Sequence, residues 1–246
     1  MRSGVGDILA KYTALADWRM AHVMTGEYFC PEIHDLMHTA ADAAVESVDG
    51  IGRGEPEAFE NVTKALLLSG IAMQMMGNSR PASGAEHHIA HLIEMHPAEL
   101  SVAFPALHGE KAGVGTLLAA REYKRLAEIG ALHPPSNAIP RSRRKKCGSF
   151  SVRGFAGLSR RKTDAIVLRK VTLGNHWRKL AAASGDYRRD PALFGGTFSV
   201  LLERLDAKRT PEDIGVSSAD LDKLLRYSPL VRNRLTLMRA RRMIIE

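Results

Sequence analysis

The chain has 246 residues and a formal net charge of +8, with 45% hydrophobic and 6% aromatic residues. This length is enough for one large domain or two small ones, each with a substantial core. The low aromatic content, together with abundant Ala and Leu, argues against a β-rich architecture and predicts an all-α chain.

Three helices are expected in the first third of the chain. The segment "GDILAKYTALADWRMAHVM" has apolar residues at helical spacing, and Asp7 stands near its start, where a carboxylate suits the helix dipole. A second helix is predicted over residues 31–50, because it opens with a proline that suits the first turn. The third runs from about 56 to 76 and is closed by Gly77. Its second half is apolar almost all round, which predicts a helix buried in the core.

Further helices are expected beyond residue 80. The stretch "RPASGAEHHIAHLIEMH" at 80–96 predicts a short helix with four histidines, and regular apolar spacing resumes from about 111 to 126. The segment "HPPSNAIP" is a loop, after which a helix begins near Thr163. Near the end, "TPEDIG" predicts a short capped turn, and Ser217 or Ser218 is the expected cap of the next helix. The segment "PLVRNRLTLMRARRMI" predicts one final amphipathic helix.

A basic tract interrupts this helical pattern. Residues 141–161 contain eight basic side chains and no acidic one, within a segment at 134–162 that we expect to be irregular. Such a tract can bind polyanions, but it is at least as often a solvated loop. Nucleic acid is therefore not an expected partner.

The cysteines and the hydropathy indicate a cytoplasmic protein. Cys30 and Cys147 are far apart in sequence and suit a reducing compartment, so no disulfide is expected. No apolar run reaches about 18 residues, and the first residues lack the apolar region of a secretory signal. We expect no association with a membrane.

The histidine-rich stretch is the first candidate for chemistry. His87 and His91 are four residues apart and share a helix face, whereas His88 points about 100° away. Neutral imidazole is the commonest protein ligand for zinc, nickel and iron. The His-x-x-x-His spacing matches a zincin protease, but such an enzyme needs Glu where His88 stands. The pair alone leaves two alternatives open, a metal site and a polar helix face without a ligand.

Three motifs together carry a family resemblance. A carboxylate on one helix, a histidine on a second and a histidine before a third can form an Asp/His/His metal site with open coordination positions. The motifs "GVGD" at 4–7, "SGAEHHIAH" at 83–91 and "LHGEKAGVGTLLAA" at 107–120 resemble the sn-glycerol-1-phosphate dehydrogenases, a branch of the iron-containing alcohol dehydrogenase superfamily. The likeness spans most of residues 1–129 and again about 163–246.

The resemblance implies a single helical metal- and substrate-binding domain over residues 1–246, similar to the C-terminal domain of these enzymes. We expect their N-terminal nucleotide-binding domain to be absent, since the sequence starts six residues before Asp7. No strand leads into a Gly-rich turn that could hold a pyrophosphate, and Gly113 and Gly115 lie within a helical pattern instead. The chain is therefore expected to be inactive alone.

The tract at 141–161 departs from the family pattern, in which a mixed-charge helical segment would be expected. A local frameshift in the gene is one hypothesis for this departure. Translating the DNA of that interval in the other frames tests it, because the absence of an acidic, helix-like alternative would remove the idea.

The resemblance also implies residue roles. By motif, Asp7, His87 and His108 are the implied metal ligands and catalytic residues, with Zn as the expected ion and Ni or Fe as alternatives. Asp7 and His91 are the implied substrate contacts. Without a metal, His108 would simply cap a helix. No role is assigned to six other candidates, for which core or surface positions are equally ordinary: His88, His96, Glu110, Lys111, Asp17 and Trp18.

The implied reaction is reversible hydride transfer between NAD(P)H and dihydroxyacetone phosphate, giving sn-glycerol 1-phosphate, with the metal as a Lewis acid at the ketone oxygen. The implied partners are a small phosphorylated polyol or ketone, further copies of the chain in a homo-oligomer, and a separate nucleotide-binding domain. Two alternatives stay open. One is another superfamily chemistry, a polyol dehydrogenase or a dehydroquinate synthase-like lyase. The other is a non-enzymatic helical module that binds a metal or a polyanion.

Overall fold

The computed structural model describes residues 1–132 and 196–244. These residues form helices, which confirms the all-α prediction, and their sole β feature is an isolated bridge between Val102 and Val216. None of the described helices is long and apolar enough to cross a bilayer. The predicted basic segment, Cys147 and the helix expected near Thr163 lie outside the described residues.

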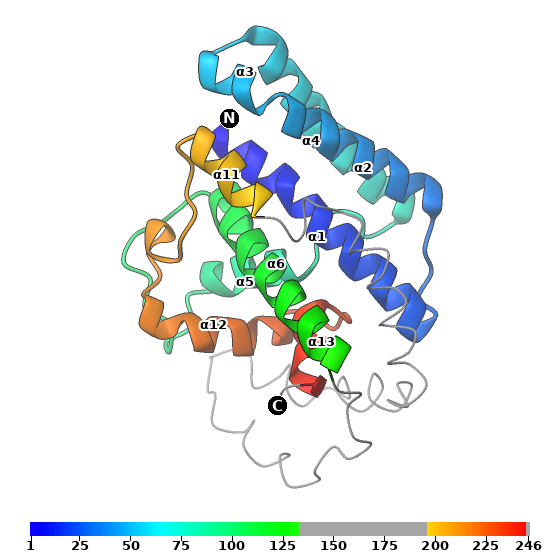
Figure 1. Ribbon diagram of the computed structural model, residues 1–246, viewed down its shortest axis with the longest axis vertical. Coiled ribbons are helices and arrows are strands. Elements are labelled where there is room, and N and C mark those ends of the chain that lie inside the picture. The colour runs from blue at the N-terminus through cyan, green and yellow to red at the C-terminus, as the bar shows by residue number, and fades with distance from the viewer. Residues whose placement is uncertain (133–195, 245–246) are drawn as a thin grey trace, which may run out of the picture.

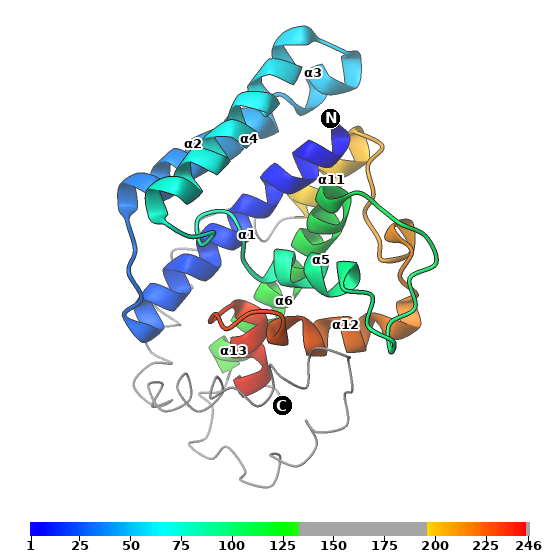
Figure 2. The ribbon, with the colours of Figure 1, turned by 180° about the vertical axis from the view of Figure 1, so that it is seen from behind.

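Helix α1 runs through the middle of the molecule and divides it (Figure 1). Helices α2 and α4 form a hairpin on one side of α1, while α5 and α6 lie on the other side (Figure 2). Helices α12 and α13 close the lower end against α5 and α6. The bounds are α1 Arg2–Thr25, α2 Pro31–Glu46, α3 Val48–Arg53, α4 Pro56–Met76, α5 Ala85–Glu94, α6 His108–Leu132, α11 Thr197–Arg204, η2 Glu212–Ile214, η3 Ser218–Asp220, α12 Leu221–Tyr227, η4 Ser228–Leu230 and α13 Leu237–Ile244.

A hydrophobic cluster fixes the histidine helix α5 in place. Ile89 and Ile93 of α5 are fully buried and pack with Val114 of α6 and Leu224 of α12. Burying each such side chain contributes about 1.5–3 kcal/mol. The apolar face of α5 is therefore fixed against α6, and this determines where its histidines lie.

Glycines let α6 approach α1 and α5 closely. A Cβ atom added to Gly109 would lie 1.9 Å from the backbone oxygen of Ser3, and one added to Gly6 would lie 2.3 Å from the oxygen of Gly109. A Cβ atom on Gly115 would lie 2.6 Å from the backbone oxygen of Glu86. Only glycine permits these contacts, which bring α6 close both to the first turns of α1 and to α5.

We expect Gly109→Ala to lower the free energy of unfolding by roughly 1–3 kcal/mol or more, because the new methyl group forces α1 and α6 apart. Chemical denaturation measures this loss. Gly70→Ala is the matched control, since a Cβ atom there meets nothing within 4 Å in α4. That change should leave stability unaltered or raise it by up to about 1 kcal/mol. Equal stability of Gly109→Ala and the parent would contradict the role assigned to the crossing.

Three helix boundaries differ from the sequence-based predictions. Helix α1 begins at Arg2, so Asp7 lies one turn further in than expected. The helix predicted over 31–50 ends at Glu46, where the Ser47 hydroxyl donates to the Ala43 carbonyl at 2.8 Å, and the chain restarts as α3. Helix α6 begins at His108 rather than near 111. The predicted bounds of α4 and its closure by Gly77 in the left-handed conformation are confirmed.

The prediction that the second half of α4 is buried all round is wrong. Leu67, Ile71 and Met75 are 64%, 48% and 60% exposed. Only the opposite face, with Ala65 and Ala72, is buried in the hairpin with α2. The described part of the chain leaves this apolar stripe open to solvent.

The single helix predicted over residues 229–244 is also wrong, because the structure splits it into η4 and α13 with a loop between them. The Asp17 carboxylate accepts a hydrogen bond of 2.6 Å from the backbone nitrogen of Leu237. Arg80 donates to the carbonyl of Leu235 at 2.9 Å. Buried side chains thus satisfy backbone groups that a continuous helix would otherwise use. The predicted turn at "TPEDIG" and the cap by Ser217 are confirmed.

Asp17 is a buried junction between helices. Its carboxylate accepts hydrogen bonds of 2.6 Å from the backbone nitrogens of Ala85 and Leu237 and from the Tyr123 hydroxyl. Burial and the neighbouring Glu86 raise the pKa of Asp17 to about 7. The carboxylate therefore ties the starts of α5 and α13 to α1 and α6.

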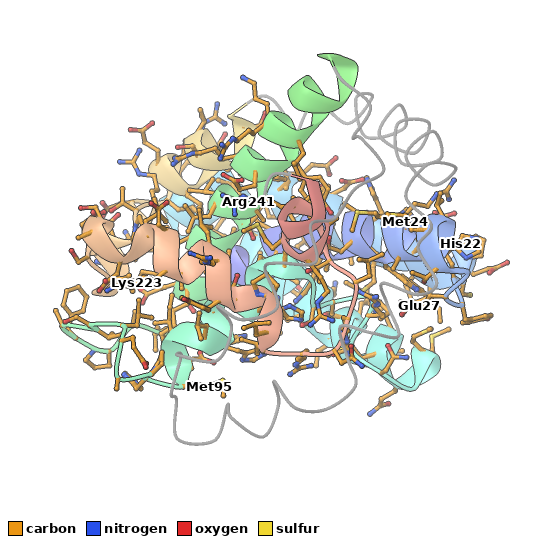
Figure 3. The ribbon with its side chains drawn as sticks, turned by 90° about the horizontal axis from the view of Figure 1, so that it is seen from below. His22, Met24, Glu27, Met95, Lys223 and Arg241 are labelled. Atoms are coloured by element: carbon orange, nitrogen blue, oxygen red, sulfur yellow. The ribbon has the colours of Figure 1, made fainter. Side chains whose placement is uncertain are left out.

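The last helix is held to α6 by an ion pair. Figure 3 shows Arg241 on α13, whose Nε atom lies 2.6 Å from Oε2 of Glu122 on α6. The two side chains are 12% and 7% exposed, so water screens this pair little. It fixes α13 beside the helices that carry the candidate site.

Candidate metal centre

The structure brings together Asp7 of α1, His87 of α5 and His108 at the first position of α6. One donor atom from each residue lies within 4.8 Å of the others, so the three could hold a metal ion. Asp7 Oδ1 is 3.2 Å from His87 Nε2 and 3.9 Å from His108 Nε2. Because these donors sit on three helices, the glycine contacts between α1, α5 and α6 determine their separation.

The Nδ1 atoms of His87 and His108 are held by carboxylates. Nδ1 of His87 lies 2.8 Å from Glu86 Oε1, and Nδ1 of His108 lies 2.9 Å from Glu94 Oε1. Ionised carboxylates only accept hydrogen bonds, so both Nδ1 atoms donate and the Nε2 atoms face Asp7. Carboxylates of this kind orient metal-binding histidines in many proteins. The arrangement therefore presents the nitrogens that a metal ion would use.

Asp7 is held in its ionised form. Its second oxygen, Oδ2, accepts a hydrogen bond of 3.0 Å from the buried Nζ of Lys11, which also donates to the Ala82 carbonyl at 3.1 Å. Burial alone would raise the pKa of Asp7, but the hydrogen bond with His87 and the charge of Lys11 hold it well below its usual range. Burial lowers the pKa of His87, but its bonds with Asp7 and Glu86 outweigh this and raise it. A cation bound here would replace the proton between Asp7 and His87.

The cluster is buried on one side and open on the other. The side chains of His87, Asp7 and His108 are 8%, 21% and 43% exposed. Three protein donors with an open side are typical of catalytic metal sites, whereas structural sites enclose the ion with four. A cavity of about 230 Å³ near the starts of α1 and α6 contains none of the three residues.

His91 lies beside the three donors. Its ring centre is 6.0 Å from that of His87 and 5.5 Å from that of His108. Nδ1 of His91 lies 3.1 Å from Glu94 Oε2, so Glu94 orients both His91 and His108. His91, Glu94 and His108 form a second group that could hold a metal. The hydrogen bonds between Glu94 and both Nδ1 atoms favour the group with Asp7 instead.

Sequence reasoning missed Glu86 and Glu94. Glu86 is fully buried and also accepts a 2.7 Å hydrogen bond from the Thr13 hydroxyl. A signal was present in "AEHHIAHLIE", where one Glu precedes the first histidine and another lies three residues after His91. The spacing of Glu94 from His91 is one at which a carboxylate can reach a ring nitrogen on the same helix.

The residues left without a role occupy other positions. His88 is fully buried, and His96 lies in the loop after α5. Oε2 of Glu110 accepts from the Leu107 nitrogen at 2.8 Å, which caps the start of α6. Lys111 lies closer to the centre, because its Nζ is 3.4 Å from Glu94 Oε1.

About half of this chain is similar to proteins named glycerol-1-phosphate dehydrogenase (NAD(P)+). It is 43% identical over 124 residues to that of Geobacillus stearothermophilus, 42% over 120 to that of Pyrococcus horikoshii and 38% over 143 to that of Thermococcus sibiricus. These alignments cover 50%, 49% and 56% of this chain, but 30%, 33% and 39% of the relatives. The chain thus matches about a third of the length of these relatives. No protein-family model matches it.

Proposed function

We propose that this chain is the metal- and substrate-binding part of an NAD(P)-dependent glycerol-1-phosphate dehydrogenase, which reduces dihydroxyacetone phosphate to sn-glycerol 1-phosphate. One observation carries the proposal: Asp7, His87 and His108 converge from three helices with one donor atom each. The relatives at about 40% identity, which carry this enzyme name, support the choice of reaction. They favour it over a polyol dehydrogenase, a dehydroquinate synthase-like lyase or a non-enzymatic module.

In this proposal Asp7, His87 and His108 hold one divalent ion, with Zn as the first choice and Ni or Fe as alternatives. When bound, the ion supplies positive charge that stabilises the negative charge developing on the ketone oxygen. Glu86 and Glu94 keep the histidine rings aligned, and Lys11 keeps Asp7 ionised.

Substrate would enter from the open side at His108. The ring of His91 is fixed by Glu94, and we propose that its Nε2 atom, which lies 3.4 Å from Arg232 Nη2, bonds a substrate hydroxyl when substrate is bound. Asp7 would share in substrate binding through the same cluster. Both roles are proposals that the positions of these side chains support.

A nucleotide-binding domain would position the nicotinamide. Residues 1–132 and 196–244 contain no strand followed by a Gly-rich turn, the usual cradle for a pyrophosphate. We propose that this domain is supplied by further sequence or by a separate chain. The exposed apolar side chains on α4 support the expected homo-oligomer.

The substrate experiment joins the chain to the nucleotide-binding domain of a relative and compares three alcohols. With NAD(P)+, we expect oxidation of sn-glycerol 1-phosphate to exceed that of its enantiomer, sn-glycerol 3-phosphate, and that of glycerol. Faster oxidation of glycerol would favour a polyol dehydrogenase instead. The same fusion carrying His108→Ala is the control, because turnover that survives it would not come from this centre.

A further inference from the structure

Two arginines beside the candidate metal centre carry charge that no described carboxylate pairs with. Arg232 and Arg234 lie in the loop between η4 and α13. Arg232 Nη1 and Arg234 Nη2 both donate to the Ser79 hydroxyl, at 3.1 and 2.9 Å. By contrast, Arg80 lies against Glu27 in a two-pronged contact. The guanidinium groups at 232 and 234 are partly exposed, so an anion can reach them.

Buried polar groups without partners gather at the same place. Among the residues that the structure describes, the hydroxyl of Ser83 has no hydrogen-bond partner, and neither do the two ring nitrogens of His88. Arg234 Nη1 donates to the backbone carbonyl of Ser83 at 3.3 Å, which places this hydroxyl next to the guanidinium. The charges of Arg234 and Arg232 act on the His88 ring, which places this ring near both guanidinium groups. In folded proteins nearly all buried polar groups have hydrogen-bond partners. Several groups without partners in one place therefore indicate a partner that is absent from the structure.

Other basic side chains nearby already have structural roles. Arg80 donates to the Leu235 carbonyl, and Arg239 donates to the carbonyls of Pro229 and Arg232. These bonds hold the loop in its conformation. Arg232 and Arg234 make fewer such bonds: both donate to the Ser79 hydroxyl, and Arg234 also donates to the Ser83 carbonyl.

The arginine pair is one side chain away from the candidate metal centre. Arg232 Nη2 lies 3.4 Å from Nε2 of His91, whose ring neighbours those of His87 and His108. The planar guanidinium group matches the oxygens of a phosphate and forms strong, charge-assisted hydrogen bonds with them. A short molecule could therefore contact both places at once.

We propose that Arg232 and Arg234, with the hydroxyls of Ser79 and Ser83, bind the phosphate group of a small phosphomonoester whose other end reaches the candidate metal centre. The identity of the ester rests on the proposed function. The anion site itself rests on the unpaired charges and the unpartnered polar groups.

Inorganic phosphate is the first probe, titrated calorimetrically into the metal-free chain so that it cannot bind a metal ion. We expect Arg232→Gln and Arg234→Gln each to weaken its affinity at least about tenfold, because each loses a charge-assisted interaction. The matched control is the double change Arg143→Gln/Arg144→Gln in the basic tract, which should leave the affinity unchanged. Circular dichroism and thermal melting test whether each variant folds.

If the arginine variants fail to fold, the variant Ser83→Ala tests the anion site instead. Its hydroxyl makes no hydrogen bond with residues 1–132 or 196–244, so removal should not lower the melting temperature. It should nevertheless weaken phosphate binding several-fold. Dihydroxyacetone phosphate should displace inorganic phosphate, whereas dihydroxyacetone should not.

Two results would overturn the proposal: phosphate affinity unchanged in all three variants at 232, 234 and 83, or an equal loss in the control at 143 and 144. The metal content of the parent chain is measured separately. Phosphate binding without metal binding would remove the proposed function but support the anion site. Metal binding without phosphate binding would support the proposed function but remove the anion site.

Discussion

The purified chain should retain about one transition-metal ion per molecule after dialysis, and the triple variant Asp7→Ala/His87→Ala/His108→Ala should retain none. The three side chains supply the donor atoms that converge within 4.8 Å. Structural zinc sites in zinc-finger peptides bind with apparent free energies of about 10–16 kcal/mol at neutral pH, and this affinity comes from the donor atoms, so removal of all three donors here should eliminate the site. Mass spectrometry of the metal content measures the result.

The matched control is His22→Ala/His34→Ala/Asp35→Ala, which removes the same residue types from other positions. Figure 3 shows His22 near the end of α1, where its ring contacts the Glu27 carbonyl. None of these residues belongs to a group able to hold a metal among the described residues. The control should therefore retain its metal. An unchanged metal content in the Asp7, His87 and His108 variant would show that the ligand assignment is wrong.

The second large effect concerns hydride transfer. The 246-residue chain alone should not reduce dihydroxyacetone phosphate with NADH or NADPH, and joining a related nucleotide-binding domain should restore the reaction. Hydride transfer needs the nicotinamide and the ketone at contact distance. Loss of that positioning forfeits roughly 7–11 kcal/mol of barrier reduction, a factor of about 10⁵–10⁸ in rate. Absorbance of the reduced nicotinamide at saturating substrate measures turnover.

Metal content must be measured in the same preparations, because an inactive chain without metal would say nothing about the missing domain. Metal retained without turnover, and turnover recovered on fusion, is the expected combination. Turnover by the unfused chain that His108→Ala abolishes would contradict the prediction. It would mean that this chain contains its own nicotinamide site.

The sequence predicted the bounds of a helix correctly where the residues that determine them lie next to those bounds in the chain. Pro56 at the first position of α4 and Gly77 after its end are neighbours of the residues they affect, so the bounds of α4 could be read directly. The exposure of Leu67 and Ile71 to solvent could not be predicted from neighbouring residues. An apolar pattern reports hydrophobicity, whereas burial depends on which other elements pack against the helix.

The candidate site was also predicted from the sequence only in part. The motifs around Asp7, His87 and His108 indicated the donors, but the pairing of Glu94 with two histidines depends on the crossing of α5 and α6. Among the described residues, the lack of a pairing carboxylate at Arg232 is likewise a result of how the chain folds. Charge counting along the sequence directed attention to residues 141–161 instead.

The junction at Asp17 has a consequence for the order in which the protein is assembled. Leu237 is synthesised 220 residues after Asp17, which at cellular rates of about 5–20 residues per second is a delay of roughly 11–44 s. Until then the carboxylate lacks its bond to the start of α13, although α5 has already been made. The helix that carries His87 can therefore reach its final anchorage only after Leu237 has been made, and a nascent chain stalled before Leu237 would expose this incomplete junction to chaperones and proteases.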